Sequence, residues 1–135
     1  MTDRLLVVDA DDELRRAYES HFSRSGFDVH CAATIAHAAS LLNAAPFDAL
    51  IADVREFPGE DHGDLAIGRL LSRNCAPRVV VLTAYGEPER AAAAARLGAD
   101  AFLHKPVSLV WLEGLLRARI EQFRSRNGGE VAATG

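Results

Sequence analysis

Four polar residues stand at the ends of short apolar runs, and their side-chain types suit phosphate chemistry. One run leads into Asp9, later runs end at Asp53 and Thr83, and the last leads to Lys105. A carboxylate can act as a nucleophile, while a hydroxyl and an ammonium group can contact and neutralise phosphoryl oxygens. Taken singly, such residues more often form turns, cap helices or face solvent. Their shared place at strand ends nevertheless predicts one site whose groups suit phosphate chemistry.

The predicted elements that must position these residues alternate between short strands and helices. Five short apolar runs, which we predict as strands, cover residues 4–9, 27–32, 48–53, 78–83 and 100–104. A stretch of helical period follows each run, at 13–26, 34–45, 63–73, 88–98 and from about residue 108. Apolar strands that alternate with helices indicate an α/β fold, a five-stranded parallel sheet with helices on both faces. Because ligands bind at the carboxyl ends of such strands, the four polar residues should converge there.

Composition and charge narrow the class of protein. The 135 residues suit one domain, which we expect at 1–124, followed by a flexible C-terminal tail at 125–135. A formal net charge of -4 argues against direct nucleic-acid binding through bulk electrostatics. Without a signal sequence or a membrane-length apolar run, we expect a cytoplasmic protein with no membrane contact. Cys31 and Cys75 fit buried or inert thiols, with a disulfide or redox switch as the alternative.

Several motifs occur together in one order: "LLVVDADDELRR", "FDALIAD", "VVVLTAYG" and "GADAFLHKP". With this set, residues 4–123 resemble the receiver domain of two-component response regulators, a phosphoacceptor family with a flavodoxin-like (βα)5 fold. The resemblance implies that the carboxylate of Asp53 is phosphorylated. It also implies a contact with the phosphoryl group, or a part in the switch that follows, for Thr83, Ala84, Lys105 and Phe102.

The resemblance further implies a Mg²⁺ site, held by Asp9, Asp53 and the backbone carbonyl of Arg55. The family usually carries two successive acids after the first strand, and in this chain the second position holds Ala10. Hard divalent cations need oxygen ligands, so the loss of one carboxylate should weaken the binding of magnesium. We therefore expect Mg²⁺ as the cofactor, with reduced affinity.

Other polar groups near the site have two interpretations each. Asp11 can supply the missing metal ligand, although capping of the first helix is the favoured interpretation for Asp11 and Asp12. The segment 53–63, "DVREFPGEDHG", is longer than the usual family loop, and the side chain of Arg55 can overhang the phosphate there. A solvated loop is favoured over metal ligation for the remaining polar residues of this segment, Glu56, Glu60, Asp61 and His62.

Two functions from different classes fit these residues. The first is a phosphorelay receiver that accepts a phosphoryl group on Asp53 from a sensor histidine kinase or a histidine phosphotransfer protein, and then switches a protein-interaction face. The alternative is a divergent receiver that is not phosphorylated in normal use and serves as a constitutive interaction or dimerisation module, which Ala10 favours. We expect no enzymatic activity. A flavodoxin-like enzyme or nucleotide binder is disfavoured because no glycine-rich loop follows the first strand.

The output of such a receiver is protein contact. We expect a downstream protein target, and a homodimer through the fourth helix, fifth strand and fifth helix as a further arrangement. Trp111 falls off the apolar stripe of the last helix, so it can anchor a partner or pack at the edge of the domain. The sequence is compatible both with a stand-alone receiver and with one excised from a longer regulator.

Overall fold

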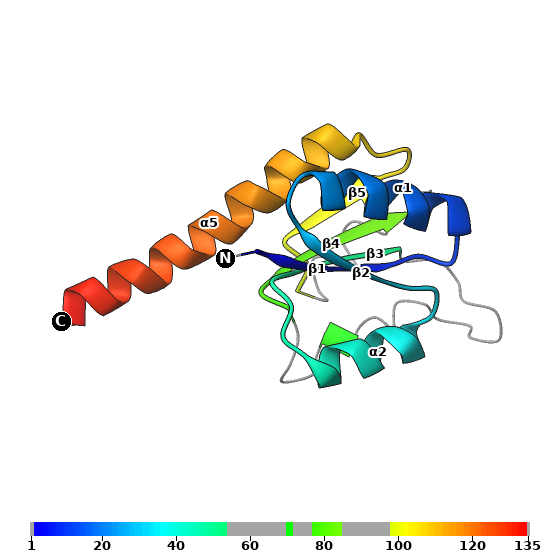
Figure 1. The fold of residues 1–135 in the computed structure, drawn as a ribbon. Helices are drawn as coiled ribbons and strands as arrows, with labels where there is room; N and C mark the ends of the chain where they lie inside the picture. Colours follow the sequence, from blue (N-terminus) through cyan, green and yellow to red (C-terminus); the bar gives the residue numbers. More distant parts are fainter. Residues whose placement is uncertain (1, 54–69, 72–76, 85–97, 135) are drawn as a thin grey trace.

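A five-stranded parallel sheet forms the centre of the computed structural model (Figure 1). The strands lie in the order β2-β1-β3-β4-β5. Their bounds are β1 (Arg4–Val8), β2 (Asp28–Ala32), β3 (Ala49–Asp53), β4 (Val79–Ala84) and β5 (Ala101–His104). The structure describes residues 2–53, 70–71, 77–84 and 98–134, and of 127–134 only the backbone. The sheet confirms the predicted parallel α/β architecture.

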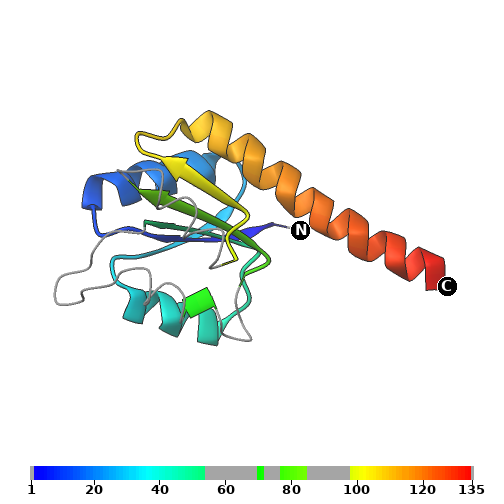
Figure 2. The ribbon, with the colours of Figure 1, turned by 180° about the vertical axis from the view of Figure 1, so that it is seen from behind.

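Helices cover both faces of this sheet. Helices α1 (Asp12–Arg24) and α5 (Leu109–Thr134) lie on one face, and α2 (Ile35–Ala44) lies on the other (Figures 1 and 2). The helices predicted at 63–73 and 88–98 fall almost entirely outside the described residues, although Leu70 and Leu71 are helical. In the described part of the chain, no helix is both long enough and apolar enough to cross a membrane.

Successive strand residues pack into two apolar clusters, one on each face of the sheet. Ile51 of β3 belongs to the buried cluster that contains Phe22 of α1 and Leu116 of α5. Its neighbour Ala52 belongs to the cluster that contains Leu42 of α2. Because side chains alternate between the faces of a strand, a strand buried on both faces must be apolar at nearly every position. This explains the continuous apolar runs in the sequence.

Local signals in the sequence set the ends of the first two helices. The Oδ1 atom of Asp11 accepts hydrogen bonds from the backbone N–H groups of Glu13 and Leu14, at 2.9 and 3.2 Å, and so caps α1. Thr34 caps α2 in the same way. The chain leaves α1 at Gly26, whose φ of 96° lies in the left-handed region that favours glycine. These ends confirm the predicted helix starts and the predicted exit.

Cys31 of β2 is a free thiol that lies half-buried. Burial, with a further contribution from the charge of Glu19, raises the pKa of this thiol from 9.0 to about 11. Since the thiolate is the reactive form, Cys31 should be inert at neutral pH. Cys75 lies outside the described residues.

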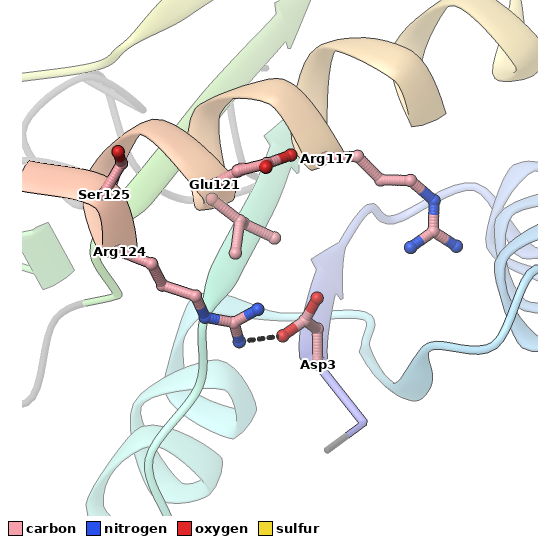
Figure 3. A pocket seen from close by; sticks show the side chains of 6 residues that line it. Asp3, Arg117, Glu121, Arg124 and Ser125 are labelled. Carbon is pink, nitrogen blue, oxygen red and sulfur yellow. Dashed lines mark hydrogen bonds and ion pairs between the residues drawn. The ribbon is translucent and has the colours of Figure 1, made fainter. Parts of the chain in front are cut away.

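Helix α5 continues well past the edge of the sheet (Figure 1). Arg124 forms an ion pair with Asp3, which precedes β1, at a surface cavity of about 550 Å³ (Figure 3). The guanidinium of Arg78 stacks over the ring of Phe123, 4.7 Å from its centroid. The helix then runs to Thr134, through the segment for which the sequence predicts a flexible tail, and the boundary at residue 124 stays a prediction.

Candidate phosphoacceptor site

The four polar residues predicted from strand ends converge at the carboxyl edge of the sheet. Asp53 pairs with Thr83 in the register of β3 and β4, so the two side chains lie on the same face. By the same alternation, the side chains of Asp9 and Lys105 continue the face that carries α1 and α5. All four side chains are buried. The predicted juxtaposition is therefore present in the structure.

Lys105 forms ion pairs with both aspartates of this site. Its Nζ atom lies 2.8 Å from Oδ2 of Asp9 and 3.1 Å from Oδ2 of Asp53. None of the three side chains is more than 2% exposed. Buried charges persist only when they are paired, and loss of one partner of such a pair costs about 3–5 kcal/mol. With all three groups ionised, these three side chains together carry one net negative charge.

The turn after β1 holds Asp9 in place through several contacts. Its second carboxylate oxygen, Oδ1, accepts a hydrogen bond from the backbone N–H of Asp11 at 2.9 Å. Its carbonyl oxygen accepts a hydrogen bond from Nη1 of Arg15 at 2.7 Å, and Arg15 also forms an ion pair with Asp12. Sequence reasoning missed Arg15, because its only signal is a position in the first turns of a helix that starts beside Asp9.

Thr83 places a hydroxyl group at the bottom of the site without a protein partner in the described part of the chain. Its Oγ1 atom is buried, and no hydrogen bond to it is found among the described residues. A buried polar group left in this state costs about 1–3 kcal/mol.

The two neighbouring candidates, Ala84 and Phe102, occupy different surroundings. Ala84 is buried, and its carbonyl oxygen accepts a hydrogen bond from the backbone N–H of Lys105 at 3.0 Å. The ring of Phe102 packs half-buried against the cluster on the α2 face, and it meets the ring of His104 edge to face at 5.3 Å. Strand alternation thus turns Phe102 away from the face of Thr83. Its part in a switch stays a prediction.

Around the predicted cation site, the structure places some candidates and leaves others outside its described part. Asp11 caps α1, as the favoured interpretation holds, and its part in metal binding stays a prediction. Ala10 is exposed in the turn between Asp9 and this cap. Arg55 and the rest of the loop 54–63 lie outside the described residues.

Two carboxylates make the site chemically suitable for a hard divalent cation. Asp9 and Asp53 approach the same ammonium nitrogen, so their oxygens face a common centre of positive charge. Oxygen donors of this kind are the preferred ligands of Mg²⁺, which also retains several waters. Among the described residues, no cluster of three or more histidine, cysteine or acidic side chains is placed to hold a metal ion. The protein ligands in this part of the chain are therefore few.

An apolar cleft of about 200 Å³ opens beside the site, between α1 and the start of α5. Tyr18 of α1 and Leu109 of α5 line it, and Lys105 forms part of its wall together with Pro106. The peptide bond between Lys105 and Pro106 is cis. The surface cavity at Asp3 lies near the opposite end of β1, so it is separate from this site.

Fold and site together define a parallel α/β domain with a buried aspartate–lysine–threonine pocket at the carboxyl ends of its strands. Comparison with known proteins gives the family. The model of the response regulator receiver domain family matches residues 5–117, and the chain belongs to this family. It is a receiver domain of the kind found in two-component response regulators.

Individual relatives agree with this assignment. The chain is 36% identical to the protein PetR of Rhodobacter capsulatus over 102 residues, which cover 76% of this chain and 42% of PetR. It is 35% identical to the regulatory protein AtoC of Escherichia coli over 106 residues, which cover 78% of this chain and 23% of AtoC. The chain thus spans less than half the length of these curated relatives.

Solved structures share the fold. A CheY-like receiver domain protein from Methanospirillum hungatei superposes with a TM-score of 0.83 at 19% identity, covering 93% of this chain and 99% of that one. A response regulator from Burkholderia pseudomallei with a phosphorylated aspartic acid, a calcium ion and citrate superposes with a TM-score of 0.73 at 22% identity. That match covers 95% of this chain and 74% of the other.

Proposed function

We propose that this receiver domain accepts a phosphoryl group on Asp53 and then switches a protein-interaction face. The observation that carries the proposal is the buried Lys105 ammonium between Asp53 and Asp9, beside the hydroxyl of Thr83. This arrangement combines a carboxylate nucleophile, a cation that neutralises phosphoryl oxygens and a hydrogen-bond donor.

The chemistry is transfer from a phosphohistidine of a partner protein. A carboxylate oxygen of Asp53 forms a bond to phosphorus while the phosphorus–nitrogen bond breaks, and the departing imidazole takes up a proton. The ammonium of Lys105 pairs with the phosphoryl oxygens, and the hydroxyl of Thr83 donates a hydrogen bond to one of them. Both groups act by position and charge, which is the main source of catalysis in phosphoryl transfer.

A divalent cation belongs to this proposal. The carboxylates of Asp9 and Asp53, with the backbone carbonyl of Arg55, would hold Mg²⁺, which supplies further positive charge to the phosphoryl oxygens when it is bound. The calcium ion and phosphorylated aspartic acid of the Burkholderia pseudomallei response regulator support a divalent cation in this role. Ala10 supplies no carboxylate, so we propose that the affinity for magnesium is weakened.

The partners follow from the same chemistry. A sensor histidine kinase or histidine phosphotransfer protein would bring its histidine to Asp53, and the apolar cleft beside Lys105 offers a docking surface for it. The phosphorylated domain would then bind a downstream protein, or a second copy of itself through the fourth helix, β5 and α5. In this scheme the chain is a cytoplasmic signalling component and not an enzyme in its own right.

Intact-mass measurement after incubation with acetyl phosphate and Mg²⁺ tests the proposal. The wild-type chain should gain one phosphoryl group, and Asp53→Asn should abolish the gain because it removes the nucleophile. Asp28→Asn, which changes an exposed aspartate of β2, is the matched control and should be labelled like wild type. Persistent labelling of Asp53→Asn would exclude Asp53 as the acceptor.

Ala10 is the one observation that favours the second candidate function, a divergent receiver that acts as a constitutive interaction module. That function predicts no phosphoryl gain at any magnesium concentration, although the chain is folded. The same mass measurement therefore decides between the two functions.

A further inference from the structure

Side chains from one turn of α5 hold this helix against the amino-terminal edge of the sheet. Arg124 forms an ion pair with Asp3, which precedes β1 (Figure 3). Its Nη2 atom also lies 4.0 Å from Oδ1 of Asp48, which precedes β3. The neighbouring Phe123 receives the guanidinium of Arg78 over its ring, 4.7 Å from the centroid. We call these contacts the amino-edge clasp, and they lie at the edge of the sheet opposite to the phosphoacceptor site.

Backbone hydrogen bonds fix the two carboxylate residues of the clasp to the sheet. The carbonyl oxygen of Asp3 accepts the N–H of Asp28 at 2.9 Å, and Oδ2 of Asp48 accepts the N–H of Arg4 at 2.7 Å. The Asp3 side chain is only 14% exposed, so its carboxylate has lost much of its hydration and Arg124 supplies a counter-charge. The helix is thus tied to acceptors that the sheet already holds in position.

Beyond Arg124, α5 leaves the sheet (Figures 1 and 2). The two side chains that follow Arg124 are exposed, and the helix continues to Thr134 through Gly128 and Gly129. Glycine is a poor helix former, and an isolated helix as short as this segment is marginal in water. The helix can therefore unravel easily from its C-terminal end up to the clasp, whereas further unravelling has to break the ion pair with Asp3.

We propose that the amino-edge clasp is a conformational stop, which arrests the unravelling of α5 at Arg124 and fixes the point from which residues 125–134 pivot. Release of the clasp moves this pivot back to the turn of Ile120, which is buried in the apolar cluster of the α1 and α5 face. The guanidinium of Arg124 is half-exposed, so salt weakens the clasp. The inference is independent of the proposed function, because it does not involve the phosphoacceptor site.

Amide hydrogen exchange of the whole chain, resolved by residue with NMR spectroscopy, tests the stop. The N–H groups of residues 121–124 open from the C-terminal end after the chain has unravelled through Arg124. Arg124→Met should therefore raise their exchange rates roughly two- to fivefold. The N–H groups of residues 130–134 lie beyond the clasp, so their exchange should stay unchanged. Salt at about 1 M should give the same pattern in wild type and little further change in Arg124→Met.

Three further variants serve as controls. Arg126→Met removes an exposed positive charge from the same end of α5 without altering the clasp, so its exchange at 121–124 should equal that of wild type. Asp3→Asn leaves α5 unaltered and should raise exchange at the same residues. The double variant Asp3→Asn with Arg124→Met should exchange no faster than Arg124→Met alone, because the ion pair is already lost.

Equal exchange at residues 121–124 in wild type and Arg124→Met overturns the inference. An equal increase in Arg126→Met overturns it as well, because the effect would then come from the helix dipole. An increase that extends to Leu112 and Leu116, in the buried first part of α5, would show a global loss of stability and also overturns the stop.

Discussion

At the scale of single residues, the site contains charged groups whose removal from water costs free energy of folding. The ion pairs of Lys105 with Asp9 and Asp53 lie almost completely out of water. Apolar residues of similar volume commonly stabilise a fold as well as or better than a buried ion pair does. Under the proposed function, the three charged residues serve phosphoryl chemistry, which accounts for their burial without a gain in the stability of the fold. The buried hydroxyl of Thr83, without a partner among the described residues, has the same explanation.

Ala10→Asp should strengthen magnesium binding by about tenfold, because it places a carboxylate next to Asp9 at the proposed cation site. The fold should tolerate the change, since Ala10 is exposed and the new charge is solvated. Without magnesium, repulsion from Asp9 and Asp53 should lower the melting temperature slightly. Melting temperatures of wild type and variant over a magnesium titration measure both effects.

Equal magnesium affinity in wild type and Ala10→Asp would contradict the weakened site. Another oxygen, such as that of Asp11 or of the loop after Asp53, would then supply the missing ligand. Ala10→Ser is a suitable control, because it adds a polar group without a charge.

At the scale of secondary-structure elements, a polar cluster joins α1 to α5. Oε1 of Glu113 on α5 lies 2.9 Å from Nε2 of His21 and accepts a hydrogen bond from the hydroxyl of Ser25. Arg117 pairs with the same carboxylate, at 3.3 Å, and also donates to the carbonyl oxygen of Ser25. The C-terminal end of α1 is thus held against the first turns of α5, the two helices that flank the cleft beside Lys105.

Glu113→Gln should destabilise the chain near neutral pH by about 1 kcal/mol or less, because it weakens these hydrogen bonds. The hydrogen bond from Ser25 is the main cause that lowers the pKa of Glu113 below 4.5, and Arg117 and His21 add to it. A folded-state pKa below the unfolded value contributes stability above about pH 4.5, and that stability is lost as the pH falls through the folded value.

Urea unfolding at neutral and acidic pH measures this contribution. Wild type should lose stability more steeply than Glu113→Gln as the pH falls below 4.5. Glu121→Gln is the matched control, since Glu121 is an exposed residue of the same helix. An acid dependence of Glu113→Gln as steep as that of wild type would show that Glu113 is not responsible.

At the scale of the whole molecule, one edge of the sheet adjoins both the site and an exposed part of the surface. β5 is an edge strand that pairs with β4 and is followed directly by Lys105. At the start of α5, the large apolar side chains of Val110 and Trp111 are exposed by 76% and 56%, a few residues after Lys105 in the sequence. A rearrangement around Thr83 and Phe102 would therefore reach a surface that a partner can contact.

Phosphorylation should change amide hydrogen exchange in residues 84–112, which include β5 and the start of α5. Exchange in β2, which lies at the edge of the sheet opposite to β5, should stay unchanged and serves as the internal control. Hydrogen–deuterium exchange with mass spectrometry, on chains with and without a phosphoryl group, gives both readings. Unchanged exchange at 84–112 in a fully phosphorylated sample would exclude a switch through this face.

The sequence by itself determines the sheet, the described helix starts and the identity of the central site residues. Strands buried on both faces must be apolar, so their ends are visible as the points where Asp9, Asp53 and Thr83 appear. Caps such as Asp11 act over a few residues, so they too can be predicted locally. The family resemblance, confirmed by the comparisons, adds the order of the motifs.

Only the tertiary structure shows which side chains form ion pairs and hydrogen bonds with one another. The pairing of Lys105 with Asp9 joins residues 96 positions apart in the chain, and the contact of Arg15 with the Asp9 carbonyl depends on how α1 leaves the turn. The continuation of α5 to Thr134 likewise could not be predicted. Composition and periodicity describe neighbours along the chain, whereas ion pairs and helix packing depend on distances in space that folding creates.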